Sequence, residues 1–308
     1  MTRDGAALPP YASTLDAAAH YGLRIYCAAV FLFLIAPVLV VVPLSFNAES
    51  FFSFTSGMLT LKPAAYSLKW YRDILANGMA APEAPFSWGW LIDCWRDSQW
   101  VLAMRNSVIV GVCATILATA LGTLAAVGLS RPEMPFRNLI TGLLISPMIV
   151  PIVITATGMF FFFSAVGLAQ TYAGLILAHA LLGTPFVVIT VTATLASFDR
   201  SLMRAAASLG AGPLRAFFSV QAPLILPGVL SGALFAFATS FDEVVVVLFL
   251  AAPDQRTIPR QMWSGLREQV SPTILAVATI LVAISLALLT SLELLRRRVE
   301  RLKAETPI

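Results

Sequence analysis

Six long apolar segments limit most strongly how this chain can fold. Each runs for about 20 residues or more with few charged side chains, and about 20 apolar residues of α-helix are needed to cross the hydrocarbon core of a bilayer. Exposed backbone groups cannot be satisfied in lipid, so such segments cross as helices. The sequence therefore predicts an all-α integral membrane protein with six transmembrane helices. The expected spans are Ile25–Phe46, Ser107–Leu129, Leu139–Phe163, Tyr172–Leu195, Leu224–Leu250 and Thr273–Leu295.

The composition agrees with a membrane protein. Of the 308 residues 58% are hydrophobic and only 12% are charged, about half the charged share of a soluble domain. The net charge of +4 is small, and no basic stripe with interleaved aromatic residues predicts a nucleic-acid partner. The first apolar segment is too long for a signal peptide, and no small-residue cleavage site follows it. We therefore expect it to be a retained anchor in contact with membrane lipid.

The arginine and lysine residues predict the orientation. Positive charge accumulates in short cytoplasmic loops, and Arg131 and Arg137 bracket one short turn while a cluster at 296–298 follows the last span. Both termini are therefore expected in the cytoplasm. The predicted organisation is an N-terminal cytoplasmic tail (1–24), a six-helix transmembrane domain (25–295) with an external loop (47–106) and a cytoplasmic loop (198–223), and a basic C-terminal cytoplasmic tail (296–308).

The external loop concentrates tryptophan. It holds five of the six tryptophans, and short amphipathic helices are predicted at 67–75 and 95–104. Tryptophan favours the membrane–water boundary because its ring is apolar and its N–H needs a polar partner. Two interpretations stay open: an interfacial belt, or a docking surface for an external partner.

The cytoplasmic loop has the pattern of two short helices separated by a turn. Asp199 or Ser201 can cap a helix start, and an alanine run from Ala205 favours helix. Gly210 suits the left-handed position after a helix end, and Pro213 suits the first turn of a second helix, whose Phe217 and Phe218 are expected to pack on the bundle. Small exposed side chains allow a partner to approach closely. The alternative is a plain connector that folds on its own chain.

The same loop resembles the EAA motif of ABC importer permeases, which reads Glu-Ala-Ala, three residues, Gly, nine residues and Ile-x-Leu-Pro. Ala205-Ala206 and Gly210 match, and Val220-Gln-Ala-Pro223 stands in for the closing four residues. Arg204 occupies the position where the family usually has Glu, so the charge at that position is reversed.

The resemblance implies the type I ABC importer permease fold, in which this loop is a coupling helix that inserts into an ATP-binding subunit. It implies four partners: an ATP-binding cassette subunit dimer, a second permease subunit, a periplasmic substrate-binding protein and the lipid of a bacterial inner membrane. ATP and Mg would be bound by the partner subunit, and this chain would carry no cofactor. The coupling residues implied are Arg204, Ala205, Ala206, Ser208, Leu209, Gly210 and Pro223.

Further segments are similar to the spermidine/putrescine subgroup of these permeases. They are Trp70-Tyr71, Asn106-Ser107, Ser146 to Pro151, Ser240 to Pro253, Arg256 to Pro259 and Met262-Trp263. This resemblance favours a small, cationic organic solute of the polyamine type, although the subgroup also serves opines and aminoalkylphosphonates. It also implies a heterodimer, because polyamine systems typically pair two different permeases.

Two adjacent acids lie within the fifth apolar segment. Asp242 and Glu243 are surrounded by Phe and Val, and a charge at the bilayer centre costs roughly 2.5–3.5 kcal/mol on insertion scales. One interpretation is an acidic lining that attracts a cation, and the other is a structural pair that caps a broken helix. On a continuous helix the two side chains would point about 100° apart. Pro151 and Thr155 in the third span are further pathway candidates, because interrupted helices often line transporter sites.

Catalytic and metal-binding functions find no support in the sequence. The chain contains no G-x-x-x-x-G-K-[ST] loop, no G-x-S-x-G and no H-E-x-x-H, and its three cysteines lack a metal-ligand spacing. His179 lies in an apolar run and is expected to be a buried helix histidine. The leading hypothesis is a non-catalytic importer subunit. The alternative is an ion-coupled secondary transporter using Asp242 and Glu243, which an inverted repeat would favour, and none is evident.

Overall fold

A computed structural model describes residues 13–131, 133–268 and 271–304 of the chain. The chain divides into two compact units, one of residues 1–74 and 270–308 and the other of residues 75–269. The described residues form helices and no named strand. The predicted all-α class is thus confirmed, while the first twelve residues and the last four of the predicted tails lie outside the described residues.

Four described helices are long and apolar enough to cross a membrane: α1 (Thr14–Leu44), α5 (Gln99–Leu129), α8 (Tyr172–Ala196) and the run Pro213–Phe241. A bent pair of shorter helices makes a possible fifth, and the described apolar part of α14 is shorter, at Thr273–Ala287. The predicted count of six spans is therefore not confirmed.

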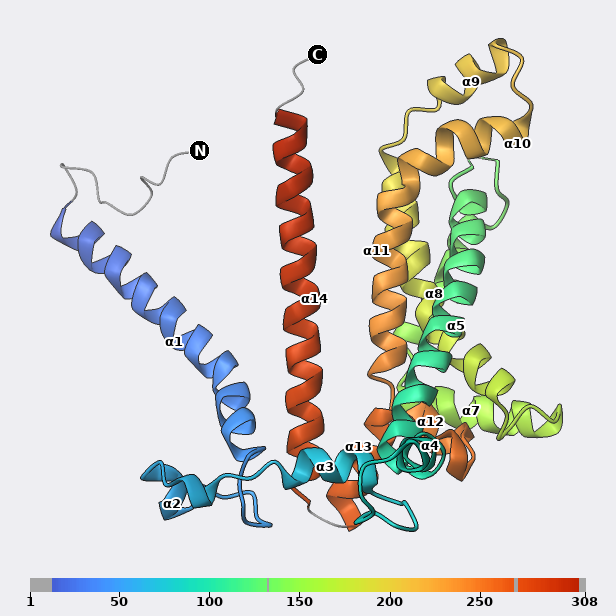
Figure 1. Ribbon diagram of the computed structural model, residues 1–308. Helices are drawn as coiled ribbons and strands as arrows, with labels where there is room; N and C mark the ends of the chain where they lie inside the picture. The colour runs from blue at the N-terminus through green and yellow to red at the C-terminus, as the bar shows by residue number, and fades with distance from the viewer. Residues whose placement is uncertain (1–12, 132, 269–270, 305–308) are drawn as a thin grey trace. The chain divides into compact units, whose positions relative to one another are not determined.

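Three helices form the core of the second unit. α5, α8 and α11 (Ala222–Phe241) pack along one another, side by side in Figure 1. Glycines make the close approach possible: a Cβ on Gly122 would lie 2.7 Å from the Cβ of Val187, and one on Gly228 would lie 2.1 Å from the Oγ1 of Thr194. Small residues of this kind let helix backbones approach in membranes.

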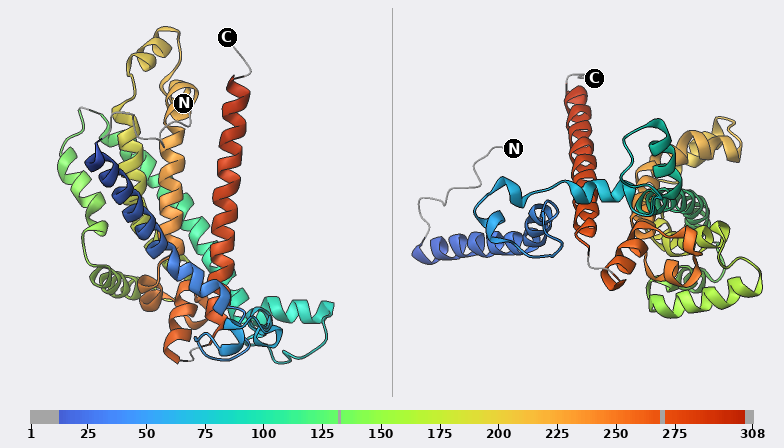
Figure 2. Two further views of the ribbon diagram at one scale, coloured as in Figure 1. Left: turned by 90° about the vertical axis from the view of Figure 1, so that its left-hand side faces the viewer. Right: turned by 60° about the horizontal axis from the view of Figure 1, so that its bottom comes forward.

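The predicted third span is not one helix. α6 (Arg137–Ile145) and the 3-10 turn η2 (Ser146–Met148) are followed by α7 (Ile152–Ala165), and the direction changes by 100° at the break, as Figure 2 shows. Pro147 and Pro151 flank the break. Proline has no N–H to donate and disfavours helix in the residue before it, so two prolines four residues apart end one helix and restart another.

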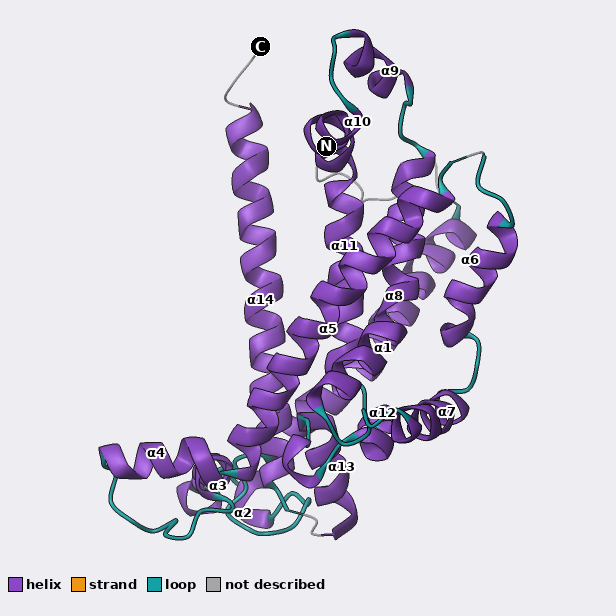
Figure 3. Cartoon of the chain, turned by 90° about the vertical axis from the view of Figure 1, so that its right-hand side faces the viewer, coloured by secondary structure: helices purple, strands orange, loops and turns teal. Residues whose placement is uncertain are grey.

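The predicted fifth span is also broken. α11 ends at Phe241, and α12 (Val245–Leu250) begins only after Asp242, Glu243 and Val244. The two acids therefore lie in the break between α11 and α12. The predicted span Leu224–Leu250 had placed them within one continuous segment. α12 packs against α7, so the two half-helices that follow the breaks contact each other, as Figure 3 shows.

The two ends of the second unit carry different elements. At one end lie α9 (Ser201–Ser208) and α10 (Pro213–Ala216), and at the other lie α4 (Trp88–Asp97), the 3-10 turn η4 (Pro253–Gln255) and α13 (Ile258–Glu268), as Figure 1 shows. The predicted helix at 95–104 is wrong, because Ser98 ends α4 and caps α5, whose first eight residues fall in the predicted external loop.

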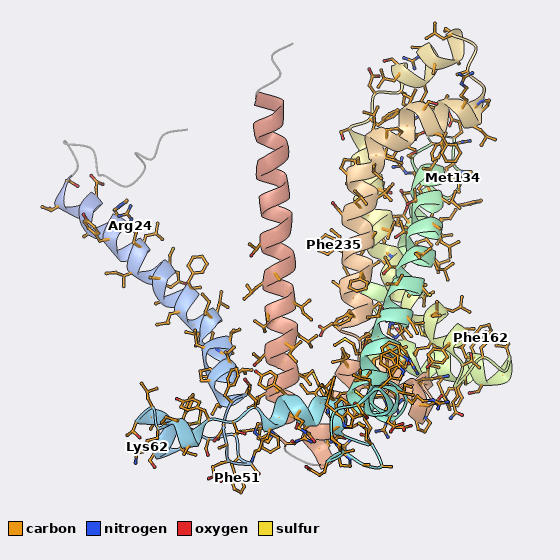
Figure 4. The ribbon with its side chains drawn as sticks, viewed as in Figure 1. Arg24, Phe51, Lys62, Met134, Phe162 and Phe235 are labelled. Carbon is orange, nitrogen blue, oxygen red and sulfur yellow. The ribbon has the colours of Figure 1, made fainter. Side chains whose placement is uncertain are left out.

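The first unit contains α1, α2 (Ser56–Leu59), the 3-10 turn η1 (Pro63–Ala65), most of α3 (Lys69–Ala76) and α14 (Thr273–Ala304). α3 matches the amphipathic helix predicted at 67–75, and α14 continues nine residues beyond the predicted span. α1 contains Pro37 and Pro43 inside its helix. The loop between α1 and α3, with Phe51 and Lys62 labelled in Figure 4, is held by buried Asn47, which donates to the carbonyls of Phe51 and Ser53.

Candidate functional site

The loop that contains α9 has the local structure that its sequence predicts. Asp199 accepts hydrogen bonds from the Ser201 N–H at 2.8 Å and from the Ser201 hydroxyl at 2.6 Å. These bonds hold the pKa of the Asp199 carboxyl below its usual value, so the cap stays ionised at neutral pH. Gly210 has a φ of +83°, the left-handed value expected after a helix end, and Pro213 opens α10.

Most of the predicted coupling residues lie on the surface of this loop. Ala206 is buried and packs inward, so one face of α9 is fixed on the rest of the unit while the other face is free. Leu209, the residue that follows α9, is a large apolar side chain that is 89% exposed. The exposed residues are Arg204, Ala205, Ser208, Leu209, Gly210 and Pro223.

The second half of the loop runs directly into the core helix. α10 continues through the π-helical turn η3 (Phe217–Gln221) into α11, with Pro223 in its first turn. The expectation that both phenylalanines pack on the bundle is wrong for Phe218, which is 68% exposed, because the wider π turn leaves it outside. π-helical turns within α-helices frequently mark functional positions.

Charged side chains cap both ends of α12. At its start the Glu243 Oε1 accepts the N–H of Val246 at 2.9 Å. At its end the Arg260 Nη1 donates to the carbonyls of Val247 at 3.2 Å and Ala251 at 3.0 Å. A negative group near a helix start and a positive group near its end both complement the helix dipole. Burial first, and then the nearby charge of Arg256, lower the pKa of Arg260, but a guanidinium stays protonated.

The four predicted pathway residues do not converge on one cavity. Asp242 is exposed at the end of α11, Glu243 is half-buried at the α12 cap, and Pro151 is exposed at the start of α7. Of the four, only Thr155 lines a cavity of about 840 Å³ in the second unit. The cavity is otherwise lined mainly by apolar residues of α5, α6, α7 and α8, and the Oγ1 of Thr155 is buried without a hydrogen-bond partner among the described residues.

α7 presents its phenylalanines in two directions. Phe163 is buried in the core of the unit, whereas Phe162, labelled in Figure 4, is 62% exposed. Phe235 of α11, also labelled there, is half-exposed as well. Exposed aromatic and aliphatic side chains along apolar helices are suited to lipid or to another membrane subunit.

Sequence reasoning missed a polar network at the α13 end. The Asn106 Nδ2 donates to the carbonyls of Asp254 at 2.8 Å and Arg256 at 3.0 Å, and its Oδ1 accepts the hydroxyl of Tyr172 at 2.8 Å. The Oγ of Ser107 accepts the N–H of Ile258 at 2.8 Å. The network fastens the segment after α12 to α5 and α8. Asn106-Ser107 had served only as a mark of family resemblance, since two residues 148 positions apart give no local signal of contact.

The buried histidine prediction is confirmed. His179 is 1% exposed, and its Nδ1 lies 2.7 Å from the Oγ of Ser240 on α11. The pair ties α8 to the last turn of α11, next to the break at Asp242. No described group of three or more His, Cys, Asp or Glu residues could hold a metal ion.

Comparison with known proteins agrees with this architecture. Residues 118–302 match the family described as binding-protein-dependent transport system inner membrane component. The chain is 32% identical to the spermidine/putrescine transport system permease protein PotC of Haemophilus influenzae over 69% of its length and 83% of the relative. It is also 32% identical to the putrescine transport system permease protein PotI of Escherichia coli, over 82% of each chain.

A solved structure shares the fold. A chain of a bacterial ABC transporter involved in the import of the acidic polysaccharide alginate superimposes with a TM-score of 0.66, covering 94% of this chain and 99% of that one at 15% identity. The sequence and structural matches together extend over most of the chain. The chain belongs to the family of binding-protein-dependent transport system inner membrane components, which are the permease subunits of ABC importers.

Proposed function

We propose that this permease forms one half of an ATP-driven import pathway for a small organic cation of the polyamine class. The observation that carries the proposal is the loop around α9, whose outer face exposes small side chains and whose inner face is packed. The chain contains no phosphate-binding loop of its own, so ATP and Mg belong to a partner. The relatives named as spermidine/putrescine and putrescine permeases support the solute class.

The coupling step follows from how the loop is attached. An ATP-binding subunit that holds α9 and moves on closure pushes α10, and α10 continues through η3 into α11. Arg204 lies on the exposed face where the family usually has Glu, which favours an acidic group on this side of the partner's cleft. It also favours pairing with a different permease that keeps the usual Glu.

The pathway proposal rests on Asp242 rather than on Glu243. Glu243 already accepts a backbone N–H, whereas the carboxylate of Asp242 is exposed at the break. An exposed carboxylate at the end of an apolar helix attracts an organic cation and costs less than a buried charge. Thr155 lies on the neighbouring half-helix α7, which Pro151 precedes as its N-cap, and α7 contacts α12.

Reconstitution tests the proposal. The permease is assembled in proteoliposomes with its ATP-binding subunit, its second permease and its periplasmic binding protein, and uptake of labelled putrescine and spermidine is measured. We expect uptake that requires ATP and that Asp242→Asn weakens while the complex still assembles. Uptake driven by an ion gradient without ATP would instead identify a secondary transporter, and normal uptake by Asp242→Asn would remove Asp242 from the pathway.

Cross-linking tests the docking surface and the orientation. Single cysteines at Ala205 and Ser208 are expected to cross-link to the ATP-binding subunit and to be shielded from an impermeant thiol reagent added outside. Asp93→Cys on exposed α4 is the matched control, and it is expected to react from outside and to capture no ATP-binding subunit. Mass measurement of the purified complex distinguishes two different permeases from two copies of this one.

A further inference from the structure

We infer that Arg200 is a positioning residue that carries the movement of the α9 loop to α5 and, through it, to α6. The inference rests on the proposed function, because it assumes that α9 receives a push. Arg200 is the N-cap of α9, directly before its first residue, Ser201. Its Nη2 donates a hydrogen bond to the carbonyl of Ser130, a residue 70 positions earlier that ends α5.

The packing of α9 explains why this contact matters. α9 packs mainly against α10 and η3, which lead into α11. α8 is joined to the loop by the chain itself through Ser197. α8 and α11 both pack along α5, and Leu195 of α8 lies in the same apolar cluster as Ala126 of α5. Arg200 adds a polar contact from the loop itself, beside a cavity of about 220 Å³ that is lined by residues of the α5 end, of the loop, of α8 and of η3. Arg200 lines this cavity and donates its hydrogen bond to the carbonyl of Ser130, which lines it as well.

The receiving end of the contact is well defined. The N–H of Ser130 donates to the Ala126 carbonyl at 2.9 Å and its hydroxyl donates to the Val127 carbonyl at 2.8 Å, so Ser130 is fixed to the last turn of α5. The last carbonyls of a helix carry partial negative charge, which a guanidinium complements. A displacement of Arg200 therefore acts on the α5 end as a whole rather than on a loose loop.

The route continues into the elements that line the large cavity. α5 is followed by a short turn that contains Met134, labelled in Figure 4, and then by α6. α5, α6 and α7 all line the 840 Å³ cavity together with Thr155. Arg200 thus lets one input at α9 move both sides of the unit: α11 directly through η3, and the α5–α6 side through the hydrogen bond to Ser130.

The test uses the complete transporter with Arg200→Ala, Arg200→Lys and the wild type. Hydrogen–deuterium exchange is compared with and without a non-hydrolysable ATP analogue for peptides covering 127–141 and 213–226. In the wild type both segments are expected to change. In Arg200→Ala the change in 127–141 falls at least about fivefold while that in 213–226 stays within about twofold, and Arg200→Lys restores most of it because lysine can still donate to a carbonyl.

Transport is measured on the same preparations. We expect Arg200→Ala to keep ATP hydrolysis stimulated by the binding protein but to consume at least about fivefold more ATP per solute imported. Arg137→Ala, which removes an exposed arginine at the start of α6, is the matched control and is expected to behave as wild type. Two results would overturn the role of Arg200: an unchanged response of 127–141 in Arg200→Ala, or an equal loss of both segments' responses. A wild type with no nucleotide response in either segment would instead refute the proposed function.

Discussion

Substitution of Glu243 tests whether its carboxylate acts as a helix cap or as a charge in the transport pathway. In Glu243→Ala the N–H of Val246 loses its acceptor in a residue with no exposed surface, and a buried donor without a partner costs about 1–3 kcal/mol. Glu243→Gln keeps an oxygen in the same place and loses only the interaction of the charge with the helix dipole, worth about 0.3–1 kcal/mol. For a unit of this size the alanine variant should melt roughly 2–12 °C lower.

The assay is the thermal unfolding midpoint of the purified complex, read together with ATP-dependent uptake in proteoliposomes. We expect Glu243→Gln to unfold close to wild type and to transport within about twofold of it, a difference that about 0.4 kcal/mol produces. Asp242→Asn is the matched control, since it removes the neighbouring charge without touching the cap. A Glu243→Gln variant that is stable but transports no solute would refute the reasoning, because the charge itself would then be needed.

Three further outcomes follow from the structure. Gly122→Ala should destabilise the complex by about 1–3 kcal/mol, since its Cβ would lie 2.7 Å from that of Val187. The Cβ of Gly128→Ala on the same helix meets nothing within 4 Å, so this variant should be neutral or stabilising by up to about 1 kcal/mol. Equal unfolding midpoints of the two variants would contradict the packing. Leu209→Glu should lower ATP-dependent uptake at least about tenfold, the effect of about 1.4 kcal/mol of lost docking, and leave the unfolding midpoint unchanged; a fall in both would point to a structural role. Cross-linking at α9 should be constant from pH 8 to pH 5, because the pKa of Asp199 is lowered in the folded protein. The hydrogen bonds of its carboxylate therefore contribute fully to stability at every pH above the unfolded pKa of about 4, and this contribution is lost only as the pH falls through the lower folded pKa. A fall in cross-linking near pH 6 would refute this role of Asp199.

The sequence predicted the α9 loop well because its signals are local. A capping acid, an alanine run, a glycine in the left-handed region and a proline in a first helical turn each depend on residues one to four positions apart. The alanine run is helical, and Gly210 and Pro213 occur where they were expected, while Asp199 accepts the N–H of Ser201 from the position before the N-cap, which is Arg200. Local rules also identified α3 and the burial of His179.

The breaks in two spans were harder to predict because the apolar pattern runs through them. From Leu139 to Phe163 and from Leu224 to Leu250 the hydropathy alone indicates one continuous helix each. What divides them is backbone chemistry: two prolines in the first case, and in the second a pair of acids one of which turns to bind a helix start. The partner that holds the other end of α12, Arg260, lies ten residues beyond its last residue, and no periodicity connects the two.

Glu243 and Arg260 are two of the few charged residues of this chain, and together they stabilise α12 by capping its two ends. A six-residue helix is far too short to be stable by itself, so α12 persists only through burial of Val246, Val247 and Leu250 and through its two caps. Glu243 lies in the short segment between α11 and α12. Arg260 lies on α13, which the hydrogen bonds of Asn106 hold against α5. The two caps of α12 therefore come from two different parts of the unit. Asp242 lies at the boundary between these two parts, which is where a displacement of α11 would change the surroundings of a carboxylate most.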